Sequence, residues 1–152
     1  MIIPIHTANY ADYLALTQPY EQEFAPLTGA SPDSSGHYPL STDIDANHPG
    51  FLYLHQGKAV GFIVVQTNEL PYDVCEIFVT KAARELGVAR KLAFYTFNQY
   101  PGAWTVKELI NAKKSRAFWL KILTEYTAQN FEETLYEDPK WGWVYKQQFN
   151  TR

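Results

Sequence analysis

The chain has little cysteine, little excess charge of one sign and no long apolar run. A single cysteine, Cys75, excludes an internal disulfide and fits a reducing compartment. With 13 Lys and Arg against 16 Asp and Glu, the chain lacks the basic excess of nucleic-acid-binding proteins. No apolar run reaches the about 18 residues that a membrane span needs, and residues 1–6 lack the basic start of a signal peptide. We therefore expect a cytoplasmic protein with neither nucleic-acid nor membrane partners.

The composition favours one folded domain over residues 1–152. Hydrophobic residues make up 46% of the chain, which is enough to bury a core, and 152 residues leave no room for two domains of usual size. Aromatic residues are frequent, at 16%. Large rings suit a tightly filled core, and the polar ends of Tyr and Trp also suit a ligand cleft. The aromatic content therefore leaves both uses open.

Hydrophobic periodicity predicts an α+β domain with elements in the order β-α-β-β-β-α-β-α-β-β. Apolar and β-branched runs predict strands over residues 2–5, 51–55, 59–65, 72–80, 104–110, 131–136 and 143–149. Apolar residues at helical spacing predict helices over about residues 10–24, 89–100 and 112–124. Between residues 26 and 50 the composition shifts to Pro, Gly, Ser and Asp, which is typical of a functional or mobile loop.

The connection between the strand at 72–80 and the following helix has features of an anion-binding turn. It contains Arg84, Gly87 and Ala89 just where the helix is expected to begin. Amides at a helix start are unpaired and the helix dipole makes that end positive, so small residues there let a phosphate approach the backbone. Arg84 and Arg90 add positive charge. An ordinary strand-to-helix turn that needs a glycine would look similar.

The stretch Arg84-Glu85-Leu86-Gly87-Val88-Ala89 resembles the pyrophosphate loop of the GNAT superfamily of acyl-CoA-dependent N-acyltransferases, whose pattern is Gln or Arg, x, x, Gly, x, Gly or Ala. The resemblance covers residues 51–122 firmly and the rest through element order. It implies a GNAT-like mixed, mostly antiparallel sheet flanked by helices, with a V-shaped split between central strands. It also implies acetyl-CoA as acyl donor, a primary amine as acceptor and no metal.

The resemblance implies how acetyl-CoA would lie on the chain. A β-bulge near the end of the strand at 72–80 would free backbone groups for the pantetheine arm, and the helix start would hold the pyrophosphate. The implied cofactor-binding residues are Phe78, Val79, Thr80, Arg84, Leu86, Gly87, Val88, Ala89, Arg90 and Asn111.

Glu76 is the candidate general base. An alkylamine with a pKa of about 10.4 must lose a proton before it attacks a thioester. Strand alternation places Glu76 on one face with Val74 and Phe78, where apolar neighbours would raise its pKa. A solvent-facing carboxylate, a salt bridge to a loop lysine, or a water chain as the base are the alternatives. Cys75 is expected on the opposite face as a small buried hydrophobe.

The sequence departs from the family where the general acid is expected. Many members carry an Asn followed seven residues later by a Tyr that protonates the leaving thiolate. Here Ala112 and Trp119 occupy those places and Asn111 lies one residue early. Tryptophan has no acidic proton to give, so the thiolate leaves unaided, another tyrosine such as Tyr126 substitutes, or catalysis is lost. The last case would make the chain a non-catalytic acyl-CoA-binding or regulatory module. If the resemblance of residues 84–89 to the pyrophosphate loop is a coincidence, the chain is instead an interaction domain without a CoA site.

The acceptor is the least defined part of the sequence hypothesis. Acidic residues in and before the long loop either attract a cationic amine or form a solvated face: Glu21, Glu23, Asp33, Asp43 and Asp45. The four histidines show no metal-ligand spacing. Trp141 and Trp143 either line the acceptor side or pack the last hairpin, and packing is the favoured interpretation. A small-molecule amine, a protein amine and a homodimer all remain open.

Overall fold

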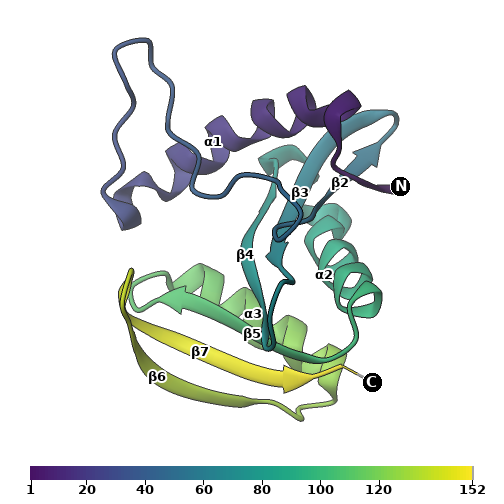
Figure 1. The fold of residues 1–152 in the computed structure, drawn as a ribbon, viewed down its shortest axis with the longest axis vertical. Helices are drawn as coiled ribbons and strands as arrows, with labels where there is room; N and C mark the ends of the chain where they lie inside the picture. Colours follow the sequence, from purple (N-terminus) through teal and green to yellow (C-terminus); the bar gives the residue numbers. More distant parts are fainter. Residues whose placement is uncertain (152) are drawn as a thin grey trace.

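The computed structural model, which describes residues 1–151, contains one mixed sheet with the strand order β1-β2-β3-β4-β5-β7-β6 (Figure 1). Its strands are β1 (Ile2–Pro4), β2 (Gly50–His55), β3 (Lys58–Gln66), β4 (Tyr72–Val79), β5 (Ala103–Leu109), β6 (Glu132–Asp138) and β7 (Gly142–Asn150). The helices are α1 (Tyr10–Thr28), α2 (Val88–Gln99) and α3 (Lys113–Thr127), with 3-10 turns η1 (Thr7–Asn9) and η2 (Lys81–Leu86). The predicted element order and the α+β class are confirmed.

The sheet splits between β4 and β5, the only parallel neighbours among its strands. They pair only at Tyr72 with Trp104 and at Asp73 with Thr105, and beyond these two positions they separate. Figure 1 shows the two halves of the sheet, β1–β4 and β5–β7–β6, joined at one end and opening away from each other. The V-shaped split expected between central strands is therefore present.

A bulge in β4 accompanies the split. Val64 of β3 lies opposite Glu76 and Val65 lies opposite Val74, so Cys75 is an extra residue on β4. Val74 packs with the core on the α2 side of the sheet, whereas Cys75 packs with the core on the α1 side. The prediction that Glu76 shares a face with Val74, and that Cys75 points the opposite way, is therefore wrong. An inserted residue reverses the alternation of every side chain before it.

The helices bury both faces of the sheet. The α1 face carries a core of Ile5, Tyr13, Leu16, Leu52, Phe62, Val64 and Phe78. The opposite face, under α2 and α3, carries the larger core, and its large side chains include Phe51, Ile63, Leu92, Phe97, Trp104, Trp119, Leu123 and Phe149. Phe97 lies within 5.0 Å of Trp104 and 4.9 Å of Phe149, measured between ring centroids. Much of the aromatic content therefore fills this core.

Helix α1 is longer than the sequence indicates, because it continues through Pro19 and Pro26 to Thr28. Both prolines are exposed, so the backbone groups that they leave unpaired can bond to water. Gly29 ends the helix in a left-handed conformation, with φ 77°, and its N–H donates to the Ala25 carbonyl. The long loop therefore spans residues 29–49. No helix within residues 1–151 combines the length and the hydropathy needed to cross a membrane.

Candidate active site

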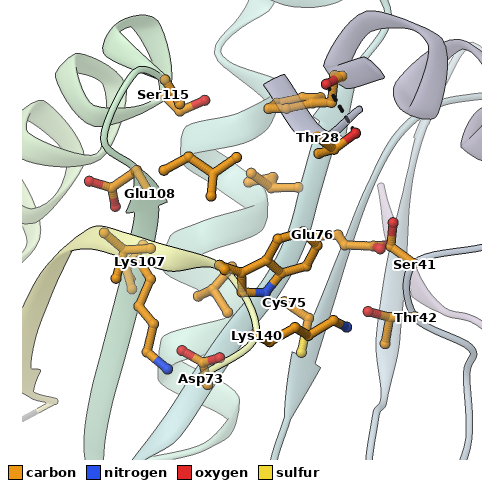
Figure 2. Close-up of a pocket in the computed structure, with 18 of the residues that line it drawn as sticks. Thr28, Ser41, Thr42, Asp73, Cys75, Glu76, Lys107, Glu108, Ser115 and Lys140 are labelled. Carbon is orange, nitrogen blue, oxygen red and sulfur yellow. Dashed lines mark hydrogen bonds between the residues drawn. The ribbon is translucent and has the colours of Figure 1, made fainter. Parts of the chain in front are cut away.

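A cavity of about 570 Å³ occupies the split between β4 and β5. Helix α1, the loop before β2, the start of α3 and the β6–β7 turn contribute its remaining walls (Figure 2). Its lining is strongly acidic. Seven carboxylates line it, from Glu21, Asp43, Asp45, Asp73, Glu76, Glu108 and Asp138, against Lys107, Lys140 and His48. Such a lining favours a positively charged ligand over a negative one.

Glu76 projects from β4 into this cavity and is only 4% exposed. Figure 2 shows it on the same side of the cavity as Ser41 and Thr42. Within residues 1–151 its Oε1 atom has no hydrogen-bond partner. Burial, followed by the nearby Glu21 carboxylate, raises the pKa of Glu76 to about 8, although hydrogen bonding from Thr42 acts in the opposite direction. A carboxylate in this setting can accept a proton near neutral pH.

Glu108, on β5, is a second buried carboxylate in the lining, and sequence reasoning missed it. Gln147 on β7 donates through Nε2 to Glu108 Oε1 at 2.8 Å and to Glu133 Oε2 at 2.7 Å. Arg116 on α3 pairs with Glu133 at 2.6 Å. Burial raises the pKa of Glu108 to about 7. The sequence did contain a signal for Glu108, because strand alternation places this carboxylate on the same face as Trp104 and Val106, two core residues.

The predicted phosphate turn begins α2 as expected. Gly87 adopts a left-handed conformation, with φ 71°, and α2 starts at the next residue, Val88. A Cβ built on Gly87 would meet nothing within 4 Å, so the backbone here is open to an approaching group. Leu86 is 46% exposed, whereas the Val88 side chain is fully buried and anchors the helix start. The geometry fits an anion bound by helix N-terminal amides.

Both predicted arginines of the turn are held by carboxylates. Arg84 Nη2 lies 2.6 Å from Glu23 Oε2 on α1, and its Nε donates to the Val79 carbonyl at 3.0 Å. Arg90 pairs with Glu125 on α3 at 2.7 Å. The guanidinium of Arg90 also lies over the Phe94 ring, 4.3 Å from its centroid. The two arginines therefore join the turn to two different helices.

The end of β4 offers backbone groups to the split. The Thr80 N–H donates to the Val60 carbonyl on β3. Antiparallel alternation then directs the N–H and C=O groups of Val79 and Ile77 away from β3. Ile77 lines the cavity, but the Phe78 side chain packs under α1, with its ring 5.9 Å from that of Tyr20. Of Phe78, Val79 and Thr80, none lines this cavity with its side chain.

The start of α3 places Ala112, Ser115 and Trp119 against the cavity, whereas Asn111 is exposed in the preceding turn and does not line it. Trp119 is 4% exposed and packs against Phe118 and Phe97. Tyr126 lies farther along α3, where its hydroxyl donates to Asn98 Oδ1 at 2.7 Å, and it does not line the cavity. Tyr126 is therefore not placed to replace the missing acid.

The acidic residues named from the sequence divide into three groups. Glu21, Asp43 and Asp45 line the cavity, and Glu23 pairs with Arg84. Asp33 lies outside it and accepts hydrogen bonds from its own loop. Trp141 and Trp143, for which the sequence left the acceptor side and hairpin packing as alternatives, are 43% and 51% exposed and lie outside the core. Trp141 borders the cavity instead.

No family model and no curated protein matches the sequence. Solved structures do match the fold. The ribosomal-protein-S18-alanine N-acetyltransferase from Escherichia coli matches with a TM-score of 0.64 and 14% identity, over 99% of this chain and 92% of that chain. An acetyltransferase from Bacillus subtilis in complex with CoA matches with a TM-score of 0.62 and 8% identity, over 99% of this chain and 98% of that chain. A protein assigned to the GNAT family from Bacteroides thetaiotaomicron matches with a TM-score of 0.65 and 13% identity, over 100% of this chain and 88% of that chain. The chain therefore has the fold of GNAT-family acetyltransferases.

Proposed function

We propose that the chain is an acetyl-CoA-dependent N-acetyltransferase that acts on a primary amine of a small molecule or protein. The observation that carries the proposal is Glu76, a buried carboxylate with an unpartnered oxygen in a cavity formed by the split sheet. The fold shared with GNAT-family acetyltransferases supports it. So does the open helix start at Gly87, which is the kind of site that binds phosphate groups.

The chain offers separate features for the parts of the donor. Backbone amides from Leu86 to Ala89 would bind the pyrophosphate, with Arg84 and Arg90 adding charge. Backbone groups of Ile77 and Val79 would pair with the pantetheine arm. Arg84 already donates to the Val79 carbonyl, so that carbonyl must share or release this bond. When bound, acetyl-CoA supplies the activated acetyl group.

Glu76 would act on the acceptor. An ammonium group entering the cavity loses its proton to the carboxylate, and the neutral amine then attacks the thioester carbonyl directly. The carbon–nitrogen bond forms and the carbon–sulfur bond breaks. The nitrogen then gives up its second proton, which the departing CoA thiolate takes, so that the products are the amide and the free thiol. Backbone N–H groups of β4 that face the split would polarise the carbonyl. Trp119 supplies no proton, so under this proposal the thiolate leaves without an acid from α3.

A non-catalytic acyl-CoA-binding module is the second candidate, and Trp119 is the observation that favours it. Such a module would bind acetyl-CoA through the same turn and strand. It would release no thiol with any amine. Turnover therefore separates the two candidates, and acetyl-CoA binding is common to both.

The test combines binding with turnover. At free acetyl-CoA about 100 times its Kd, the free energy of unfolding should rise by roughly 2.7 kcal/mol, and the melting temperature should rise with it. Calorimetry should report binding, and a thiol-release assay over a panel of amines should identify an acceptor. No melting shift at millimolar acetyl-CoA, with no heat of binding, would overturn both candidates. Binding without thiol release would leave the module.

A further inference from the structure

Glu21 and Glu76 form a pair of buried carboxylates in the cavity wall. Glu21 comes from α1 and Glu76 from β4, and each residue is 4% exposed. Glu21 Oε1 accepts a hydrogen bond from the Ser41 hydroxyl at 2.7 Å, while Glu76 Oε1 is unpartnered. Within residues 1–151 no Lys, Arg or His lies within ion-pair distance of either carboxylate. Two buried carboxyl groups without a charged partner either hold a proton, as the raised pKa of Glu76 indicates, or bind a cation.

The other acidic groups of the lining each have at least one hydrogen-bond or ionic partner, although the Oε2 atom of the equally buried Glu108 has none. Asp43 accepts from the Tyr10 hydroxyl, and Asp45 pairs with His48. The remaining bonds join Asp138 to Lys107, Asp73 to Thr105 and Glu108 to Gln147. Lys140 is exposed and lies over the Trp141 ring, 4.8 Å from its centroid, and its charge acts on Glu76 to lower the pKa of that carboxyl, against the larger effects of burial and Glu21. Of these partners only His48 and Lys107 can carry positive charge, so Asp43, Asp73 and Glu108 add negative charge to the approach. The Glu21–Glu76 pair is distinguished by having two neighbouring buried carboxyl groups with no cation within ion-pair distance.

We propose that the acceptor is a small diamine that carries no carboxylate, with its reacting ammonium held between Glu21 and Glu76. This inference rests on the proposed function and names its substrate class. The two carboxylates have different tasks. Glu21 balances the positive charge of the bound ammonium, and Glu76 takes the proton that the nitrogen must lose before it attacks.

The second amino group of a diamine is favoured by the rest of the lining. Glu76 and Glu108 bind protons near neutral pH because their pKa values are raised, but the five other carboxylates still outnumber the two lysines and the histidine. The field along the cavity therefore stays negative after one ammonium is bound. A second positive charge lowers the energy in that field, whereas a carboxylate on the acceptor raises it. Free amino acids and acidic peptides should therefore be poor acceptors, even where they carry an amine of the right length.

Four small probes of similar length separate these effects: butylamine, 1,4-diaminobutane, ornithine and 4-aminobutanoate. With acetyl-CoA present, thiol release should show a KM for 1,4-diaminobutane at least about tenfold below those of butylamine and ornithine. The amine 4-aminobutanoate should be the poorest. Calorimetry with the CoA-saturated protein should give the same ranking of affinity without any turnover.

The variant Glu21→Gln tests the residue assignment, with Glu132→Gln as the control, because Glu132 is exposed on β6 and does not line the cavity. Glu21→Gln should raise the KM for 1,4-diaminobutane at least about tenfold and change kcat less. It should also move the acidic limb of the kcat profile to lower pH, because the Glu21 charge no longer disfavours the charged form of Glu76. Glu132→Gln should leave the KM for 1,4-diaminobutane and the pH profile of kcat unchanged.

Three outcomes would overturn this inference. Butylamine or ornithine could bind as tightly as 1,4-diaminobutane, the diamine could fail to bind the CoA-saturated protein, or Glu21→Gln could behave like Glu132→Gln. In each case, acetyl-CoA binding and thiol release with some other amine would leave the proposed function standing. Absence of acetyl-CoA binding would instead remove the proposed function itself, and this inference with it.

Discussion

Arg84 Nη2 contacts both carboxylate oxygens of Glu23, at 2.8 and 2.6 Å. The same guanidinium donates through Nε to the Val79 carbonyl at the end of β4. One side chain therefore joins α1, the end of β4 and the turn before α2. An arriving pyrophosphate would find this arginine already paired with a carboxylate.

Removing that carboxylate should strengthen acetyl-CoA binding. Glu23→Gln removes the negative charge that competes for Arg84 and repels the pyrophosphate. The pair is partly exposed, so the expected gain in affinity is modest, about twofold to fivefold. Calorimetry at low and moderate salt measures it, and the gain should shrink as salt rises. A loss of affinity would mean that Glu23 positions Arg84 for the donor rather than competing with it.

Gly87→Glu should abolish acetyl-CoA binding while leaving the fold intact. The new carboxylate would lie where the helix N-terminal amides are open, and it would repel phosphate. Because φ at Gly87 is 71°, any side chain there adds strain of about 1–2 kcal/mol.

Gly57→Glu is the matched control for that strain. Gly57 lies in the β2–β3 turn with φ 78° and equally open space. Both variants should lose similar thermal stability, and only Gly87→Glu should lose the donor. If the two bind acetyl-CoA alike, the phosphate site lies elsewhere.

Glu76→Gln should keep acetyl-CoA affinity and lower kcat by about 10² or more near neutral pH. Burial raises the pKa of Glu76 to about 8, so wild-type kcat should rise as pH increases toward that value and the carboxylate ionises. The deficit of the variant should shrink at high pH, where more of the amine is already neutral. Profiles of kcat against pH for both proteins test this. Equal kcat throughout would favour a water relay as the base.

Glu108→Gln should stabilise the fold at alkaline pH and leave it unchanged near pH 4.5. Burial raises the pKa of Glu108 from 4.5 to about 7, so the folded protein binds this proton more tightly than the unfolded chain. The stabilising effect of that proton is complete below the unfolded pKa and is lost as pH rises through the folded one. The variant should gain up to about 3 kcal/mol above pH 7.

Urea unfolding at pH 4.5 and 8 measures this difference. A glutamine at position 108 can still accept from Gln147, so the hydrogen bond between β5 and β7 is retained. A variant that is less stable at both pH values would show that Glu108 is needed in its charged form by the Gln147–Glu133–Arg116 network.

The sequence alone determined the order of the elements and the position of the turn at Gly87. Both depend on local properties. Apolar residues recur with the period of the element that they form, and a left-handed turn before a helix favours glycine. Most element boundaries were predicted within a few residues. Helix α1 extends beyond its predicted end because its two prolines are exposed, so the backbone groups that they leave without a helical partner can bond to water. The catalytic and donor-binding roles of the residues remain predictions.

Only the tertiary structure decided how the candidate site is assembled. The face of Glu76 depends on a bulge, which exists only through the pairing of β4 with β3. The environment of Glu76 depends on Glu21, and that of Arg84 on Glu23, two carboxylates that α1 brings across the sheet. Glu108 is buried against Gln147, 39 residues away in the chain. Periodicity describes neighbours along the chain, whereas burial and charge pairing depend on residues that meet only after folding.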